Sequence, residues 1–126
     1  MKYTKFEELP IWQESIALVK LIYHTTSQGS WNKDFGLRDQ IQRATVSISS
    51  NIVEGFEKNN NNEFIRFLRI AKGSTGEARN QLYIALEIKY LPQKEFDTLN
   101  EQFLKVANNI GGLISYLEKY RKSQKA

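Results

Sequence analysis

Apolar residues recur along most of the chain at steps of three and four, the spacing of one face of an α-helix. The pattern is most regular near the C-terminus, where no step is missed. A seam of this kind packs knobs into holes against a neighbouring helix. It consists of Phe96, Leu99, Phe103, Val106, Ile110, Leu113, Leu117 and Tyr120.

The same spacing and its boundary residues predict four helices, over residues 10–26, 35–56, 62–90 and 92–120. Pro10 and Pro92 stand at two of the starts, where a missing N–H costs no hydrogen bond. Residues 27–34 are predicted to form a loop that ends in a cap from Asn32 or Asp34. Asn60, followed three residues later by Glu63, resembles a capping box for the third helix.

The first predicted helix is apolar over a broad sector. One row contains Trp12, Ile16, Val19, Tyr23 and Thr26, and a neighbouring row contains Ile11, Ser15, Leu18 and Ile22. Strand-like alternation of useful length does not occur. Helices joined by short connections are antiparallel to their neighbours. The sequence therefore predicts an all-α protein with residues 1–126 as one domain, an antiparallel up-and-down four-helix bundle.

The composition favours a soluble protein of a reducing compartment. There is no cysteine, and no apolar run approaches the roughly 20 residues that span a bilayer. The N-terminus lacks the apolar segment of a signal peptide. We expect a cytoplasmic protein without a membrane partner.

Charge offers a candidate nucleic-acid surface. The formal net charge is +4, and a surplus of three lies over residues 118–126, in a basic tail over residues 119–126 that follows Glu118. A second set of cations follows the outer side of the third predicted helix, interleaved with Glu63, Glu77 and Glu87, so a merely solvated face is the competing interpretation. The candidate phosphate contacts are Arg66, Arg69, Lys72, Arg79, Lys119, Arg121 and Lys122.

A polar row follows the second predicted helix beside its apolar stripe, and it comprises Arg43, Ser47, Ser50, Asn51 and Glu54. Polar groups at the edge of a core need partners, so we interpret the row as a partly buried structural network. Ligand contact and catalysis are the alternatives. Catalysis lacks a base, because His24 is the single histidine and has no cysteine or second histidine beside it. No metal or cofactor is expected.

Two helices show a second apolar sector outside the core face. On the second helix it contains Val46, Val53 and Phe56, and on the third it contains Ile70, Gly73, Ile84 and Ile88. A helix that is apolar on two sides usually has a partner on each. We therefore predict a homo-oligomer with these residues at its interface.

Several segments together resemble the bacterial family of 23S rRNA intervening-sequence proteins, also called S23-type proteins. They are residues 9–23, Gly36 to Ala44, Ser47 to Gly55, and Glu63 to Leu68 running into Ala71 to Ser74 and Glu77. The resemblance covers nearly the whole chain in the same order. It implies a four-helix bundle that assembles into a ring, commonly a pentamer. A similar fold serves as the accessory protein of diversity-generating retroelements, as a partner of nucleic acid and reverse transcriptase.

The leading hypothesis from the sequence is a non-enzymatic, homo-oligomeric bundle that acts as a binding or scaffold protein and contacts RNA through its basic residues. The alternative is a protein-binding adaptor without a nucleic-acid role.

Overall fold

The computed structural model describes residues 3–125, with side chains described over residues 3–120. Within that range the chain contains helices and no strand. The elements are the 3-10 helix η1 (Phe6–Glu8) and the α-helices α1 (Pro10–Thr26), α2 (Gly29–Lys33), α3 (Phe35–Glu57), α4 (Asn61–Glu87) and α5 (Gln93–Lys125). None of the described helices is both long enough and apolar enough to span a bilayer.

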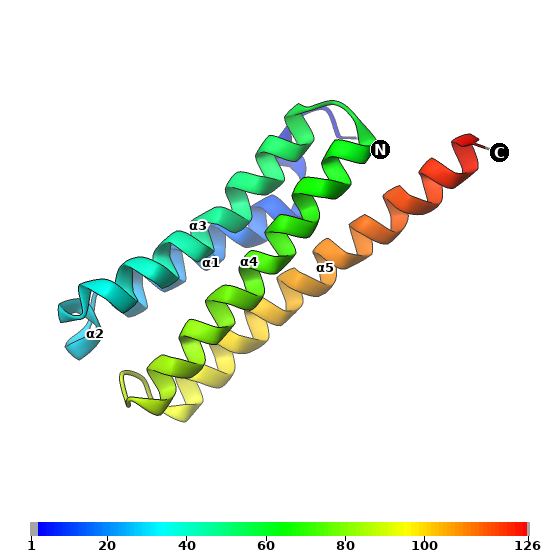
Figure 1. The fold of residues 1–126 in the computed structure, drawn as a ribbon. Coiled ribbons are helices and arrows are strands. Elements are labelled where there is room, and N and C mark those ends of the chain that lie inside the picture. Colours follow the sequence, from blue (N-terminus) through cyan, green and yellow to red (C-terminus); the bar gives the residue numbers. More distant parts are fainter. Residues whose placement is uncertain (1–2, 126) are drawn as a thin grey trace.

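The four long helices lie side by side and alternate in direction, which confirms the predicted up-and-down bundle (Figure 1). Contact is most extensive between α3 and α4, and it is much weaker between α1 and α5. The bundle is thus tightly packed along the order α1, α3, α4, α5 and looser where α5 returns to α1.

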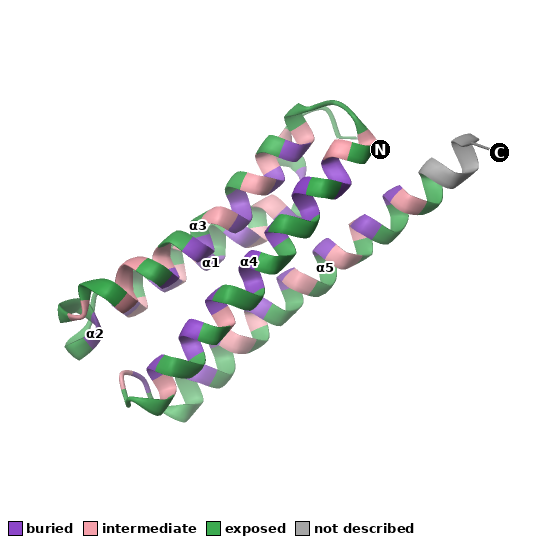
Figure 2. Ribbon diagram, in the orientation of Figure 1, coloured by how far each residue is buried: buried purple, intermediate pink, exposed green. Residues whose placement is uncertain are grey.

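The core runs along the inner sides of all four long helices, as the purple segments show (Figure 2). Its largest fully buried aliphatic and phenyl side chains are Leu9, Leu18, Ile22, Ile41, Ile48, Ile52, Ile65, Leu68, Leu82, Phe103 and Ile110. Burial of one such side chain stabilises the fold by about 1.5–3 kcal/mol. The apolar spacing in the sequence therefore corresponds to a continuous core.

Helix α1 uses the second of its two apolar rows for the core. Ile11, Ser15, Leu18 and Ile22 are buried, whereas Ile16 and Tyr23 are exposed. Because α1 has few contacts with α5, it turns only one narrow stripe inward. The row that begins at Trp12 is left at the outer edge, except for Thr26 at its end, which is buried.

Helix α5 follows the predicted seam as far as Ile110 and then departs from it. Beyond Ile110, Ile114 is buried in place of Leu113 and Tyr120 is exposed, whereas Leu117 of the predicted seam remains buried. A straight helix has 3.6 residues per turn and drifts away from a strict heptad repeat. The helix also continues to Lys125, beyond its predicted end at residue 120, so Lys119 lies within a helix rather than in a frayed tail.

The segment predicted as a loop contains the short helix α2. Its Trp31 is fully buried and lies against Tyr90, with ring centroids 6.2 Å apart. This indole closes the end of the bundle where α4 passes to α5.

The caps from Asp34 and Asn60 are present, but the Asn60–Glu63 pair forms only half of the predicted capping box, because the Glu63 carboxylate pairs with Arg66 instead of the Asn60 N–H. The Asp34 carboxylate accepts a hydrogen bond from the Leu37 N–H at 3.1 Å, and the Asn60 side chain accepts one from the Glu63 N–H at 3.0 Å. Pro10 occupies the first turn of α1. These contacts satisfy backbone donors that a helix start leaves unpaired.

Candidate interaction surfaces

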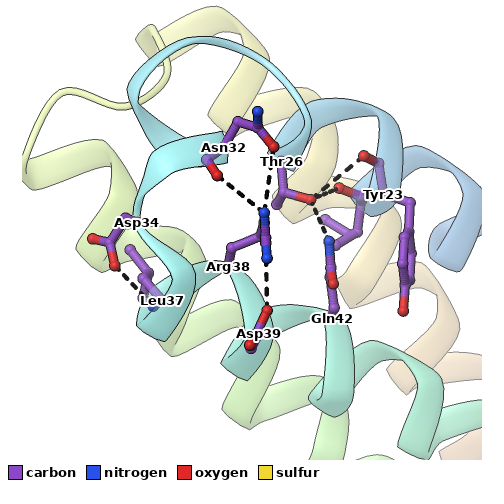
Figure 3. Close-up of polar contacts among 9 residues, drawn as sticks. Tyr23, Thr26, Asn32, Asp34, Leu37, Arg38, Asp39 and Gln42 are labelled. Atoms are coloured by element: carbon purple, nitrogen blue, oxygen red, sulfur yellow. Dashed lines mark hydrogen bonds and ion pairs between the residues drawn. The ribbon is translucent and has the colours of Figure 1, made fainter.

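The corner between α1 and α3 holds a group of polar side chains that fix its geometry (Figure 3). The Arg38 guanidinium donates to the carbonyl of Asn32 at 3.0 Å and to the Asp39 carboxylate at 3.3 Å. The Gln42 amide donates to the Thr26 hydroxyl at 3.0 Å. Arg38 and Gln42 therefore hold α2 and the end of α1 against α3, which assigns them a structural task.

The polar row on α3 forms a smaller network than the sequence predicts. The Asn51 amide donates to the carbonyl of Ser47 at 2.8 Å and to its hydroxyl at 2.9 Å. The Ser47 hydroxyl meets the Ser74 hydroxyl of α4 at 3.1 Å. Arg43 and Glu54 are exposed and make no hydrogen bond or ion pair with any described residue. The predicted partial burial of these two charges is therefore wrong, because a position beside the apolar stripe still leaves a long charged side chain in contact with water.

The cations of α4 lie along its outer side, and most have partners within the chain. Arg66 pairs with Glu63 at 2.8 Å, and Arg69 approaches Glu118 at 3.5 Å. The pKa of Arg66 is raised, first by its hydrogen bond to Glu63, then by the charge of Glu63, and least by the charge of Glu54. These pairs reduce the positive charge that α4 presents to a phosphate.

Other basic residues form no ion pair with a described carboxylate. The Arg79 guanidinium donates to the Asn100 side chain at 2.9 Å, a neutral partner that leaves its charge uncompensated. Lys72 and Lys119 are exposed and form no ion pair with a described residue. The side chains of Arg121 and Lys122 lie outside the described residues.

An exposed apolar face follows α1 and α3 and is called here the α1/α3 face. Trp12 and Val53 line one open groove of about 290 Å³, and the remaining members continue the same helix sides at steps of three, four and seven residues. The face comprises Ile16, Tyr23 and Val46, which are exposed, and Trp12, Val19 and Val53, which are half-buried. Exposure reaches 40% at Ile16 and 46% at Tyr23.

A second exposed apolar face, the α4 face, consists of Ile70, Gly73, Ile84 and Ile88. Ile84 is 41% exposed and Ile88 is 48% exposed. A Cβ at Gly73 would meet no atom within 4 Å. Apart from Phe56, the predicted interface residues thus fall into two groups, one beside α1 and the other on α4.

Phe56 belongs to neither face. It is half-buried, and its ring packs edge-on against Phe64, with centroids 5.9 Å apart. Phe56 is therefore part of the packing between α3 and α4, at the end of the bundle where these helices are joined.

Two cavities lie at opposite ends of the bundle. One of about 660 Å³ is lined by His24, Tyr90 and Lys94 among others, and there the exposed His24 ring is hydrogen-bonded to the Gln28 amide at 2.8 Å. No group of three histidine, cysteine or acidic side chains that could hold a metal occurs among the described residues.

The other cavity, of about 690 Å³, is called here the tyrosine cavity. Its walls include Tyr3, Tyr116 and Tyr120 together with Asn59 and Asn61. This site was not predicted from the sequence. The spacing of Tyr116 and Tyr120 on one helix side, next to the basic end of α5, was the available signal.

Comparison with known proteins gives a consistent result. The family model described as 23S rRNA-intervening sequence protein matches residues 7–112. A crystal structure of a protein of unknown function from the S23 ribosomal protein family of Bacteroides thetaiotaomicron is similar, with a TM-score of 0.78 at 21% identity. That match covers 83% of this chain and 95% of the other. No curated protein sequence matches at a significant level.

Proposed function

The chain belongs to the family of 23S rRNA-intervening sequence proteins, and from that premise we propose that it is a non-enzymatic, homo-oligomeric scaffold that binds RNA in the cytoplasm. Each part of the proposal has its own support. The exposed apolar faces support the proposed oligomer, and the distribution of charge supports RNA binding. The hydrogen bonds among the polar side chains support a function without catalysis.

The single observation that carries the proposal is the pair of separate apolar faces on one bundle. Exposed apolar patches of this kind mark interaction sites. Two different faces favour a head-to-tail contact, in which the α1/α3 face of one copy packs on the α4 face of the next. Contacts of that type close into rings when the rotation between copies permits. The family resemblance favours a pentamer.

The RNA part rests on cations that have no carboxylate partner. Lys72, Arg79 and Lys119 form no ion pair with a described residue, and the formal net charge of the chain is +4. A ring repeats these cations in every copy, and linked sites bind a long polyanion more strongly than one site does. The family name refers to an intervening sequence in 23S rRNA, and we therefore propose RNA as the polyanion that the protein binds.

The non-enzymatic part rests on the polar groups that catalysis would need. The polar row of α3 joins Ser47 and Asn51 to Ser74, none of which has a general base beside it. The single histidine is exposed and contacts an amide. A nucleophile acts through an adjacent base, which this arrangement does not supply.

One pair of variants tests the head-to-tail contact. We expect Ile16→Glu and Ile84→Glu each to abolish assembly, because a carboxylate in an apolar interface loses its hydration. Mixing the two variants should restore a single contact, between the intact α4 face of the first and the intact α1/α3 face of the second. The mixture should then have twice the mass of 14.7 kDa in light scattering.

Leu104→Glu on the outer side of α5 is the matched control and should leave the wild-type mass unchanged, since Leu104 is 36% exposed and belongs to neither face. Two monomeric variants that remain monomeric when mixed would contradict the head-to-tail contact. So would an Ile84→Glu variant that still forms a dimer through its α1/α3 face.

RNA binding is tested by its dependence on salt. Phosphate contacts release counterions, so the affinity for RNA should fall steeply and linearly on a logarithmic salt scale. Replacing Lys72 and Lys119 with glutamine should make that slope shallower. Absence of RNA binding at low salt, with assembly intact, would favour the alternative of a protein-binding adaptor. One observation favours that alternative: Arg66 and Arg69 pair with carboxylates within the chain, which reduces the positive charge available to RNA.

A further inference from the structure

The tyrosine cavity is lined by residues of the connection between α3 and α4 and of the C-terminal half of α5. Figure 1 shows the α3–α4 connection and the C-terminal half of α5 toward the same end of the bundle. Its volume of about 690 Å³ falls within the range of cavities that enclose small ligands. The edge-on pair of Phe56 and Phe64 provides an apolar wall. The cavity is thus large enough for one aromatic ring system with its substituents.

Three tyrosines also line the cavity, Tyr3, Tyr116 and Tyr120. Tyr116 and Tyr120 stand four residues apart on α5, so their rings project from the same side of the helix. Tyr116 is 50% exposed, and Tyr3 and Tyr120 are exposed as well. No hydrogen bond from these hydroxyls to a described residue occurs. A planar apolar ligand would therefore find free aromatic faces here.

The polar lining suits the edge of a nucleobase. The side chains of Asn59 and Asn61 form no hydrogen bond with the described residues, whereas Asn60 is occupied in capping α4. A free amide presents both donors and an acceptor, which matches the mixed pattern on the edge of a base. The carboxylate of Glu57 also borders the cavity, so a phosphate inside it would be repelled.

Two basic residues are sequence neighbours of lining residues, although neither lines the cavity itself. Lys58 directly follows Glu57, with its Nζ 5.8 Å from the centre of the Phe67 ring, and the exposed Lys119 lies between Tyr116 and Tyr120 in the sequence. The sequence continues with Arg121 and Lys122. Positive charge outside and a carboxylate inside favour a ligand whose neutral ring enters while its phosphates stay at the rim.

We propose that the tyrosine cavity binds one unstacked base of single-stranded RNA, with the base against Tyr116 and its backbone at Lys58 and Lys119. This inference rests on the proposed function, because it names the form of RNA that the scaffold recognises. Base stacking on aromatic side chains and a basic rim are the two general elements of single-strand recognition. Paired bases of a duplex are unavailable for such stacking.

Fluorescence anisotropy with a labelled oligouridylate of about 12 nucleotides, a length within the usual range of single-strand sites, tests the proposal. The comparison strands are an RNA duplex and an abasic ribose-phosphate strand of the same length. We expect the oligouridylate to bind more tightly than the abasic strand. Tyr116→Leu should weaken its binding about tenfold and leave binding of the abasic strand unchanged.

Two further variants separate stacking from folding. Tyr116→Phe retains the ring and should bind the oligouridylate like the wild type. Tyr83→Leu removes a tyrosine that is 45% exposed on α4, away from the cavity, and should have no effect. Light scattering on each variant should return the wild-type mass, because Tyr116 lies in neither apolar face.

Each result has a defined meaning. Equal affinity of the wild type for the oligouridylate and the abasic strand, or equal binding by Tyr116→Leu and Tyr83→Leu, would overturn the base site and leave RNA binding by the scaffold intact. Failure of the wild type to bind any of the three strands at low salt would overturn the proposed RNA function together with the site.

Discussion

At the level of single residues, Asp34 connects the short helix α2 to two other elements. Its carboxylate accepts the Leu37 N–H at the start of α3 and the Tyr90 hydroxyl at 2.8 Å, just beyond the end of α4. The hydrogen bond from Leu37 lowers the pKa of Asp34, and that from Tyr90 adds to the effect. The same contact with Asp34 is the main reason that the pKa of Tyr90 is raised.

These shifts predict a stability window. A carboxyl group whose pKa is lowered in the folded protein stabilises the fold at pH values above its ordinary pKa of about 3.9. This contribution is lost as the pH falls through the lowered pKa of the folded protein. A raised tyrosine pKa stabilises the fold below about pH 10 and is lost above it. The difference in unfolding free energy between the wild type and Tyr90→Phe should therefore be largest between these limits and shrink at both ends. Urea titrations across the range measure it, and a difference independent of pH would contradict the assignment.

Gly55 permits the close approach of α3 and α4. A Cβ on Gly55 would lie 2.7 Å from the Cβ of Phe67 and 3.0 Å from the Cδ1 of Phe64. Because the Phe67 Cβ moves only with the backbone, Gly55→Ala should destabilise the protein by about 1–3 kcal/mol.

Gly112 in α5 is the control for that substitution, since an added Cβ would meet no atom within 4 Å. Gly112→Ala should stabilise the protein by about 0.5–1 kcal/mol through helix propensity alone. Thermal melts of both variants compare the effects directly. Stabilisation of similar size at both positions would show that α3 and α4 are not in close contact at Gly55.

At the level of helices, α5 contributes the largest side chain of the central core. Phe103 is fully buried, whereas the adjacent Leu104 is 36% exposed. Phe103→Ala should cost about 3–5 kcal/mol of unfolding free energy, because it leaves a cavity that its neighbours only partly fill. Leu104→Ala should cost less than about 1 kcal/mol. Chemical denaturation measures both, and similar losses would contradict the orientation of α5.

The helices themselves could be predicted from the sequence because each carries a periodic stripe and boundary residues such as Pro10, Asp34 and Asn60. The orientation of α1 could not. Its two apolar rows have equal periodicity, and only packing against α3 and α5 determines that Leu18 is buried and Ile16 is not. Helix α2 was missed because five residues are too few to show a period, although Trp31 was an improbable residue for an exposed loop.

The candidate sites could be predicted only in part, because the burial of a side chain depends on the packing of neighbouring helices. A sequence places Arg43, Ser47 and Glu54 on one side of a helix, but the depth of each depends on the neighbouring helix. Ser47 meets Ser74, and the two charges stay in water. The tyrosine cavity escaped prediction because its walls come from the N-terminus, the connection between α3 and α4, and α5.

At the level of the whole molecule, the bundle presents two apolar faces that its own helices leave uncovered. The α1/α3 face and the α4 face expose bulky residues such as Ile16, Tyr23, Ile84 and Ile88. A head-to-tail ring would cover both faces at once, place the basic residues of every copy on one assembly and repeat the tyrosine cavity in each. Assembly is therefore the step on which the other parts of the account depend.

The mass of the wild-type protein in dilute solution tests that central claim most directly. Multi-angle light scattering at micromolar concentration should return a multiple of the 14.7 kDa chain mass, with a pentamer as the number that the family resemblance favours. The mass should stay constant over a range of concentrations, because a closed ring leaves no free face to add further copies. A mass of 14.7 kDa at every concentration would contradict the account.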